Sequence, residues 1–228
     1  MSQNTILNTK LHSLLTITFI FLLFISNMAE IKVVNFFGIS QLGAGTIFFP
    51  LLYVLNDIIT EVYGFSASRR TIWLALIFNI SFSLIMYSII YLPEGDDWLE
   101  KDAFETIFNL TPRIMAGSLI SYFLGELINA SIISHLKLKF NGQFFAMRAI
   151  FSTFISSFVE SILFGIIAFY KRMPDDELIK MIVTLSLVKV FYEIIVMPFT
   201  IIFISYLKKL EQLDVYEKPS FRNIFPKW

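Results

Sequence analysis

The sequence predicts an all-α integral membrane protein, built as a bundle of six transmembrane helices. Of its 228 residues, 56% are hydrophobic and 16% are charged, whereas a soluble domain is about 45–50% apolar and about 25% charged. Six apolar stretches each reach the roughly 20 residues that a helix needs to cross a bilayer. The 26 phenylalanines are more than one small soluble core would bury. These observations exclude an ordinary cytosolic enzyme and a disordered chain.

The charge balance and the missing residue types exclude further classes. Lys+Arg and Asp+Glu are equal at 18 each, so no net basic field attracts nucleic acid. The chain has no cysteine and only two histidines, His12 and His135. Disulfides, thiolate chemistry and a Cys/His metal site are therefore not expected, and no cofactor motif is present.

The predicted helices are bounded by polar or turn-forming residues. The first follows Lys10 and ends before Glu30, and it is too long and lacks the small-x-small site expected of a cleaved signal. The second ends before Tyr63-Gly64. In order, the six predicted helices are Leu11–Ala29, Gly43–Val62, Thr71–Leu92, Ile114–His135, Ala146–Phe169 and Met181–Leu207.

The longest predicted loop, Pro93–Pro112, leaves no room for a second domain. Trp98, Phe104 and Ile107 stand among acids in it, which favours a short interfacial helix. The chain thus divides into an N-terminal segment (1–10), a six-helix domain (11–207) and a C-terminal tail (208–228).

The distribution of basic residues predicts that both termini are cytoplasmic. With that orientation, 11 of the 18 Lys and Arg residues lie inside, six lie outside and Lys189 lies within a helix. An excess of cytoplasmic Lys and Arg is what the positive-inside rule describes.

Ionisable residues inside the predicted helices are candidates for function. Each costs about 2.5–3.5 kcal/mol near the bilayer centre, so each is expected to be paired, protonated or hydrated. Three acids from three helices, Glu126, Glu160 and Glu193, lie near the midplane, roughly 20 Å from a helix end at about 1.5 Å per residue. The full set of ionisable residues within the helices is Asp57, Glu61, Glu126, Glu160, Lys189 and Glu193.

These residues have different expected roles. Glu61 lies near the cytoplasmic end, where Arg69 or Arg70 would neutralise it in a structural pair. Lys189 and Glu193 are four residues apart and either lock one helix or join a site. Glu126 and Glu160 have no cation within a turn on their own helices, which favours substrate binding or proton coupling.

Polar stripes accompany the midplane acids and are expected to face the bundle interior. One carries Ser118, Tyr122, Gly125, Glu126 and Asn129, and the other Arg148, Ser152, Ser156 and Glu160. Packing between helices would explain the serines but not the buried glutamates. Pro50 and Pro198 are expected to kink the second and sixth helices, and Tyr53 and Tyr192 are candidates for stacking on a ligand.

The second predicted helix carries the most specific motif, Phe49-Pro50-x-x-Tyr53-x-x-x-Asp57-x-x-Thr60-Glu61-x-Tyr63-Gly64, followed by Arg69-Arg70 and Trp73. With it, the chain resembles the queuosine precursor transporter family over about Asn27–Lys209. Arg148 with Ser152-Thr153, and Lys189-x-x-x-Glu193 before Pro198, extend the resemblance.

Two departures from the family pattern fall in the expected substrate site. Gly125-Glu126 and Asn129 stand where members have Gly-Gln and then Asp, and Ser156-Ser157 with Glu160 stands where they have Ser-Gln and then Asp. A different preferred precursor would account for such a rearrangement.

The resemblance implies import of 7-deazaguanine bases across the bacterial inner membrane for tRNA queuosine modification, without catalysis. The expected partners are the small-molecule substrate and the lipid bilayer, a homodimer stays open, and no nucleic acid is expected. The expected substrate-binding residues are Glu126, Asn129, Glu160, Lys189, Glu193, Asp57 and Tyr53. The expected structural residues are Pro50, Glu61, Gly64, Arg69, Arg70 and Arg148.

Other functions stay open on the sequence. The chain could be the substrate-capture subunit of an energy-coupling-factor vitamin importer, although Leu11–Ala29 lacks an Ala-x-x-x-Ala docking face. An intramembrane protease would need a membrane His near Ser or a Gly-x-Gly-Asp motif, and neither is present. A small structural membrane protein would not need three midplane acids.

Overall fold

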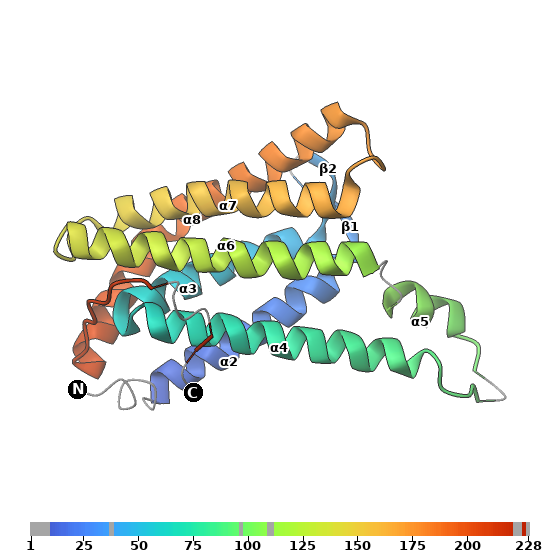
Figure 1. Cartoon of the computed structure of the whole chain (residues 1–228), viewed down its shortest axis with the longest axis horizontal. Coiled ribbons are helices and arrows are strands. Elements are labelled where there is room, and N and C mark those ends of the chain that lie inside the picture. The colour runs from blue at the N-terminus through green and yellow to red at the C-terminus, as the bar shows by residue number, and fades with distance from the viewer. Residues whose placement is uncertain (1–9, 37–38, 96–97, 109–111, 221–224, 227–228) are drawn as a thin grey trace.

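The computed structural model describes residues 10–36, 39–95, 98–108, 112–220 and 225–226 (Figure 1). Within these ranges six helices are long and apolar enough to cross a membrane, which confirms the predicted six-helix bundle. The spans lie in α2 (Lys10–Ala29), η1 with α3 (Ala44–Ile47 and Phe49–Tyr63), α4 (Phe65–Ile89), α6 (Pro112–Lys139), α7 (Phe145–Phe169) and α8 (Asp175–Glu211).

The helix ends differ from the prediction where special residues set them. Pro50 stands in the first turn of α3, so it helps to start this helix, and the expected kink there is wrong. Gly64 has φ +90° and separates α3 from α4, which begins at Phe65, six residues before the predicted start. Pro198 does lie inside α8, as expected.

The connection between α2 and α3 contains a β-hairpin that the sequence analysis did not predict. Strand β1 (Val33–Phe36) pairs antiparallel with β2 (Ile39–Gly43), with Val34 opposite Leu42. Glu30 packs against Gly43 and Gly45 so closely that a Cβ at either glycine would collide with its carboxylate. The hairpin therefore fixes Glu30 at this end of the bundle, which we call the cavity end.

The loop after α4 contains the expected short helix, α5 (Lys101–Phe108). Phe104 stands between Trp98 and Phe108, with ring centroids 5.8 and 4.7 Å away. In Figure 1, α5 projects from the same end as the hairpin.

At the opposite end, which we call the tail end, α6 turns into α7 and the chain after α8 folds back. Figure 1 shows α6 and α7 side by side, with α8 crossing them obliquely. The 37 residues of α8 span about 55 Å at 1.5 Å per residue, more than a bilayer core of about 30 Å. An oblique course accommodates that length.

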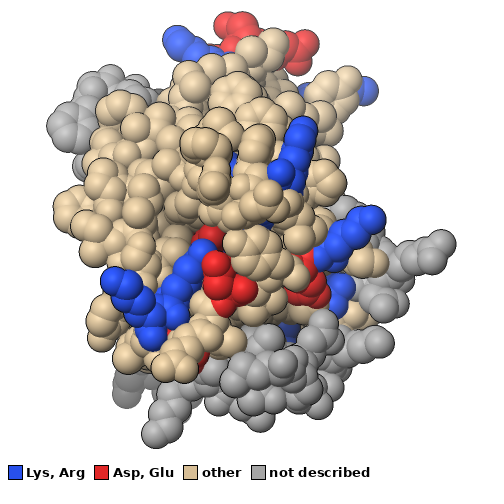
Figure 2. All heavy atoms as spheres, turned by 90° about the vertical axis from the view of Figure 1, so that its left-hand side faces the viewer, with Lys and Arg blue, Asp and Glu red and all other residues tan. Residues whose placement is uncertain are grey.

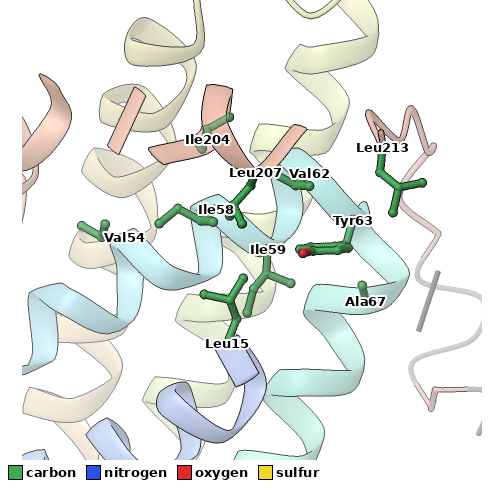
Figure 3. Close-up of a cluster of buried hydrophobic side chains, with 10 residues drawn as sticks. All are labelled: Leu15, Val54, Ile58, Ile59, Val62, Tyr63, Ala67, Ile204, Leu207 and Leu213. Atoms are coloured by element: carbon green, nitrogen blue, oxygen red, sulfur yellow. The ribbon is translucent and has the colours of Figure 1, made fainter. Parts of the chain in front are cut away.

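A cluster of buried apolar side chains lies toward the tail end (Figure 3). It joins Leu15 of α2, Ile59 and Val62 of α3, Leu207 of α8 and Leu213 of the following segment. The start of α2 and the segment after α8 therefore lie at one end of the bundle, as an even number of crossings requires.

The outer faces of the helices are apolar, as a lipid environment demands. Phe191, Phe199 and Ile202 of α8 are 66–72% exposed, and α2 and α4 present similar side chains. Polar side chains are instead buried between the helices, which places the functional candidates inside the bundle.

Candidate functional site

A cavity of about 430 Å³ opens at the cavity end. Its walls come from the end of α2, the β-hairpin, η1 and the adjoining halves of α4, α6, α7 and α8. Phe49 and Tyr122 line it together with several apolar side chains. Its size falls within the range of about 300–1,000 Å³ typical of small-molecule sites.

The floor of the cavity carries a buried ion pair from two helices. The Nζ of Lys189 on α8 lies 2.6 Å from Oε2 of Glu160 on α7, and the Tyr53 hydroxyl on α3 donates to the same carboxylate oxygen. Lys189 also lies 5.3 Å from the Tyr53 ring centroid. Of the two roles left open for Lys189, the pairing with Glu193 within one helix is therefore not formed, because the ammonium turns to the neighbouring helix.

Gly125 allows this floor to form. A Cβ at Gly125 would lie 2.9 Å from Cβ and 3.2 Å from Cγ of Glu160. Because glycine has no side chain, α6 leaves the space in which Glu160 reaches Lys189.

Below the floor lies a layer centred on Glu126 of α6, which is 1% exposed. Asn56 Nδ2 on α3 donates to Glu126 Oε2 at 2.6 Å, and Asn56 Oδ1 accepts from Ser68 on α4. The two contacts fix the Asn56 amide between an acceptor and a donor. Asn56 and Ser68 are functional candidates that the sequence analysis missed, although Asn56 precedes Asp57 in the motif.

A further layer contains Asp57 of α3 and Glu193 of α8, whose carboxyl groups are neighbours. Asn129 Nδ2 donates to Asp57 Oδ1 at 2.6 Å, and Asn129 Oδ1 accepts from Thr153 and Ser156. Both oxygens of Glu193 are buried, and no donor of a described residue reaches them.

Glu61 lies at the tail end of α3 in a different environment. Arg148 Nη1 and Nη2 reach its two oxygens at 2.8 and 3.3 Å, and Lys208 Nζ lies 2.7 Å away. Lys137 donates to the backbone carbonyl of Glu61 and lies 3.8 Å from its carboxylate. The expected neutralisation of Glu61 by Arg69 or Arg70 is thus wrong, since the ion pairs come from α6, α7 and α8.

The cations around Glu61 also hold the chain after α8. Asp214 lies 2.5 Å from Lys137 and 2.9 Å from Lys208. Burial opposes ionisation of Asp214, but hydrogen bonds from the two lysines outweigh it and lower the pKa of this carboxyl below 3.8. Figure 2 looks onto this end, where basic and acidic side chains lie together amid uncharged surface.

Gly64 and Arg148 explain how the tail end closes. Val215 N donates to Val62 O, and a Cβ on Gly64 would lie 2.8 Å from Cγ1 of Val215. Arg148 is fully buried and also donates to the carbonyls of Gln143 and Gly142 in the α6–α7 turn. Four helices and the following segment are therefore tied together around Glu61.

Of the seven expected substrate-binding residues, Glu160 and Lys189 line the cavity. Tyr53 lies directly behind them, bonded to Glu160. The others, Glu126, Asn129, Asp57 and Glu193, lie in the layers beneath, each at most 2% exposed.

Residues at the cavity rim were also missed by the sequence analysis. Glu30 lines the cavity, and burial raises its pKa although Lys189 and the Thr46 backbone partly offset this effect. Asn27 donates to Asn79 Oδ1 at 2.8 Å across the wall. A polar residue where a helix ends gives little signal, because the same pattern is typical of ordinary helix termini.

Residues 43–203 match the family model described as "Putative vitamin uptake transporter". The chain belongs to the vitamin uptake transporter family. The matched range is more than half of the chain and contains all the layers from the cavity floor to Arg148. The chain is accordingly a multi-pass bacterial membrane protein.

Curated relatives point in the same direction. The chain is 22% identical over 175 residues to a protein of Bacillus subtilis (strain 168) named "Probable queuosine precursor transporter", covering 76% of each chain. It is 23% identical over 131 residues to the "Queuosine precursor transporter" of Escherichia coli (strain K12), covering 58% of this chain and 56% of the relative. The resemblance indicated by the second-helix motif is thereby confirmed. No solved structure gives a significant match.

Proposed function

We propose that the chain imports 7-deazaguanine precursors of queuosine across the bacterial inner membrane and binds them on the Glu160–Lys189 floor. The observation that carries this proposal is the buried carboxylate–ammonium pair, 2.6 Å apart, at the bottom of an otherwise largely apolar cavity. Family membership and the names of the two relatives support the substrate class.

The chemistry of the floor fits the polar edge of such a base. A guanine-like edge has two adjacent N–H donors beside a carbonyl acceptor. A carboxylate accepts both donors in a fork, and an ammonium donates to the carbonyl. Glu160 and Lys189 supply one group of each kind from neighbouring helices.

The walls fit the remaining parts of the base. Phe49 and Tyr122 offer aromatic surface to a flat ring. Glu30 at the rim would balance the positive amine of an aminomethyl precursor or of queuine.

The function is tested in a host that can neither synthesise nor import queuosine precursors. Expression of the chain, with each precursor supplied in turn, is expected to restore queuosine in tRNA. Glu160→Gln should lose this rescue, whereas the matched change Glu100→Gln, in an exposed acid before α5, should keep it. Rescue by Glu160→Gln equal to the unchanged chain would contradict the proposed site.

Purified protein in liposomes distinguishes this function from an ATPase-dependent subunit. Uptake of a labelled precursor by the chain alone supports a self-sufficient transporter. Uptake that appears only with added ATPase subunits would favour the energy-coupling-factor alternative.

We also propose that the cavity end faces the outside, as the bias of basic residues predicts. The chain has no cysteine, so single cysteines report cleanly. Leu99→Cys near α5 should react with an impermeant reagent in intact cells, and Lys139→Cys at the tail end should not. The reverse pattern would overturn the orientation.

A further inference from the structure

We propose that Asp57 and Glu193 share one proton and form the site that couples substrate import to proton entry. This inference rests on the proposed import function and adds its energy source. It assigns a role to a layer of buried acids that the cavity does not reach.

The geometry isolates the two carboxyls from cations. Asp57 is 1% and Glu193 is 2% exposed. The buried cations of the two neighbouring helices, Lys189 of α8 and Arg148 of α7, have other partners, since Lys189 pairs with Glu160 and Arg148 with Glu61. Among the ion pairs of the described residues, none involves Asp57 or Glu193.

The groups that face the pair from the packed helices are acidic or neutral. Glu126 and Asn129 face Asp57 from α6, and Thr153 faces Glu193 from α7. From α2 and α4, His12 and Arg69 contact the rings of Tyr63 and Phe65, towards the tail end. The field of the neighbouring groups therefore opposes a second negative charge on the pair.

Two adjacent carboxylates without a cation in a low dielectric cannot both be ionised. A proton on one carboxyl removes the repulsion and turns that group into a donor for the other. It would also supply the donor that the buried oxygens of Glu193 otherwise lack. One shared proton thus satisfies charge and hydrogen bonding together.

The surrounding hydrogen bonds indicate which carboxyl holds the proton. Thr153 and Ser156 donate to Asn129 Oδ1, which orients the amide so that Nδ2 donates to Asp57. Asp57 Oδ1 is thus occupied as an acceptor, while both oxygens of Glu193 still lack a donor. Asp57 then carries the proton on its other oxygen and donates it to the Glu193 carboxylate.

The pair is placed to respond to events at the floor. Asp57 follows Tyr53 by one helical turn on α3, and Glu193 follows Lys189 by one turn on α8. The helices that supply Tyr53 and Lys189 to the floor therefore also carry the pair, one turn beneath it. A rearrangement that opens a path from the cavity, past the floor and through this layer would expose the proton to the tail end.

Uptake of the nitrile precursor into liposomes tests the coupling, because this base lacks the basic aminomethyl group that could itself bring in a proton. With the outside one pH unit more acidic, the unchanged protein should accumulate the base up to about tenfold, the limit for one proton worth about 1.4 kcal/mol per unit. A protonophore should abolish the accumulation.

Asp57→Asn and Glu193→Gln should each lose accumulation while they still exchange labelled for unlabelled base, and Glu100→Gln should behave like the unchanged chain. Retained exchange shows that a variant is folded. Accumulation by both variants, or accumulation driven by a sodium gradient alone, would overturn the proton site while leaving import intact.

Infrared spectroscopy supplies a readout that does not depend on transport. The purified protein at neutral pH should show a protonated carboxyl band that is lost in Asp57→Asn and persists in Glu100→Gln. If that band is absent, or unchanged in Asp57→Asn, the shared proton is refuted. Absence of any transport with the band present would instead count against the proposed import function.

Discussion

The protein contains two groups of acids whose surroundings are opposite. At the tail end, Glu61 and Asp214 are surrounded by three cations, Arg148, Lys137 and Lys208. At the cavity floor and in the layers below it, Asp57, Glu126, Glu160 and Glu193 have one ion-pair partner among the described residues, Lys189. The first group is more than neutralised and the second is left with excess acid, which agrees with a structural role for the first and with the proposed binding and proton coupling for the second.

The largest expected effect separates the two groups by stability. Glu61→Gln leaves three cations around one remaining carboxylate and should cost about 3–5 kcal/mol of unfolding free energy, as breaking a buried ion pair does. Glu193→Gln removes a carboxyl that has no cation, so we expect a change below about 1 kcal/mol. Thermal unfolding in detergent measures both variants.

Equal destabilisation of the two variants would contradict the structural role of Glu61. Full stability of Glu61→Gln, together with a fall in substrate affinity of the folded protein, would also contradict it. Arg148→Met serves as the matched change on the cation side and should resemble Glu61→Gln.

A second prediction concerns affinity at the floor. Glu160→Gln removes the carboxylate that accepts the donors of the base, and we expect a loss of about 1.5–3 kcal/mol, or roughly 10- to 150-fold in affinity. Glu126→Gln should have the smaller effect, because Glu126 lies beneath the floor and a glutamine oxygen can still accept from Asn56. Binding of labelled precursor to purified protein gives both values, and a larger loss in Glu126→Gln would move the site one layer deeper.

Gly125→Ala tests the floor without touching a charge. The new methyl group would press on Cβ and Cγ of Glu160, which lie close to the α7 backbone, and this overpacking should cost about 1–3 kcal/mol in affinity. Gly117→Ala on the same helix is the control, since its Cβ would lie 3.3 Å from Ile167 and away from the floor. Equal uptake by the two variants would show that the position of Glu160 is not critical.

The smallest expected effect is a pH dependence at the tail end. The pKa of Asp214 is lowered below 3.8 in the folded protein, so its contribution is complete above about pH 4 and is lost as the pH falls through the folded value. Asp214→Asn should remove this part of the acid sensitivity and cost about 1 kcal/mol or less at neutral pH. Unfolding curves between pH 3 and 7 measure this sensitivity. The same pH dependence of stability in Asp214→Asn and in the unchanged chain would show that the contact is unimportant.

Much of the fold was predictable because membrane spans leave a strong signal of length and hydrophobicity. The hairpin of β1 and β2 was not, since a short paired segment between two spans has no comparable period. In the site, depth along the helices singled out Glu126, Glu160 and Glu193, and of these Glu160 lines the cavity. Rotation and tilt decide partners, however, and no sequence spacing shows that Lys189 turns to Glu160 rather than to Glu193.

The tail end shows the same limit. Lys137 and Lys208 lie just beyond the predicted helix ends at His135 and Leu207, where a lysine is ordinarily solvated. Their burial depends on Asp214 and on the segment that folds back over α3, a tertiary contact between residues about 75–150 positions apart. Such contacts are invisible to a reading of single helices.

The order of synthesis determines when the segment around Asp214 can pack against the tail end of the bundle. Asp214 and Val215 leave the ribosome after all six spans, and until then Lys137 lacks two of the groups that hold it, the Asp214 carboxylate and the Val215 carbonyl. Newly inserted chains thus carry an excess of positive charge at the tail end until this segment docks. Docking then supplies the acid and the carbonyl that complete the surroundings of Lys137.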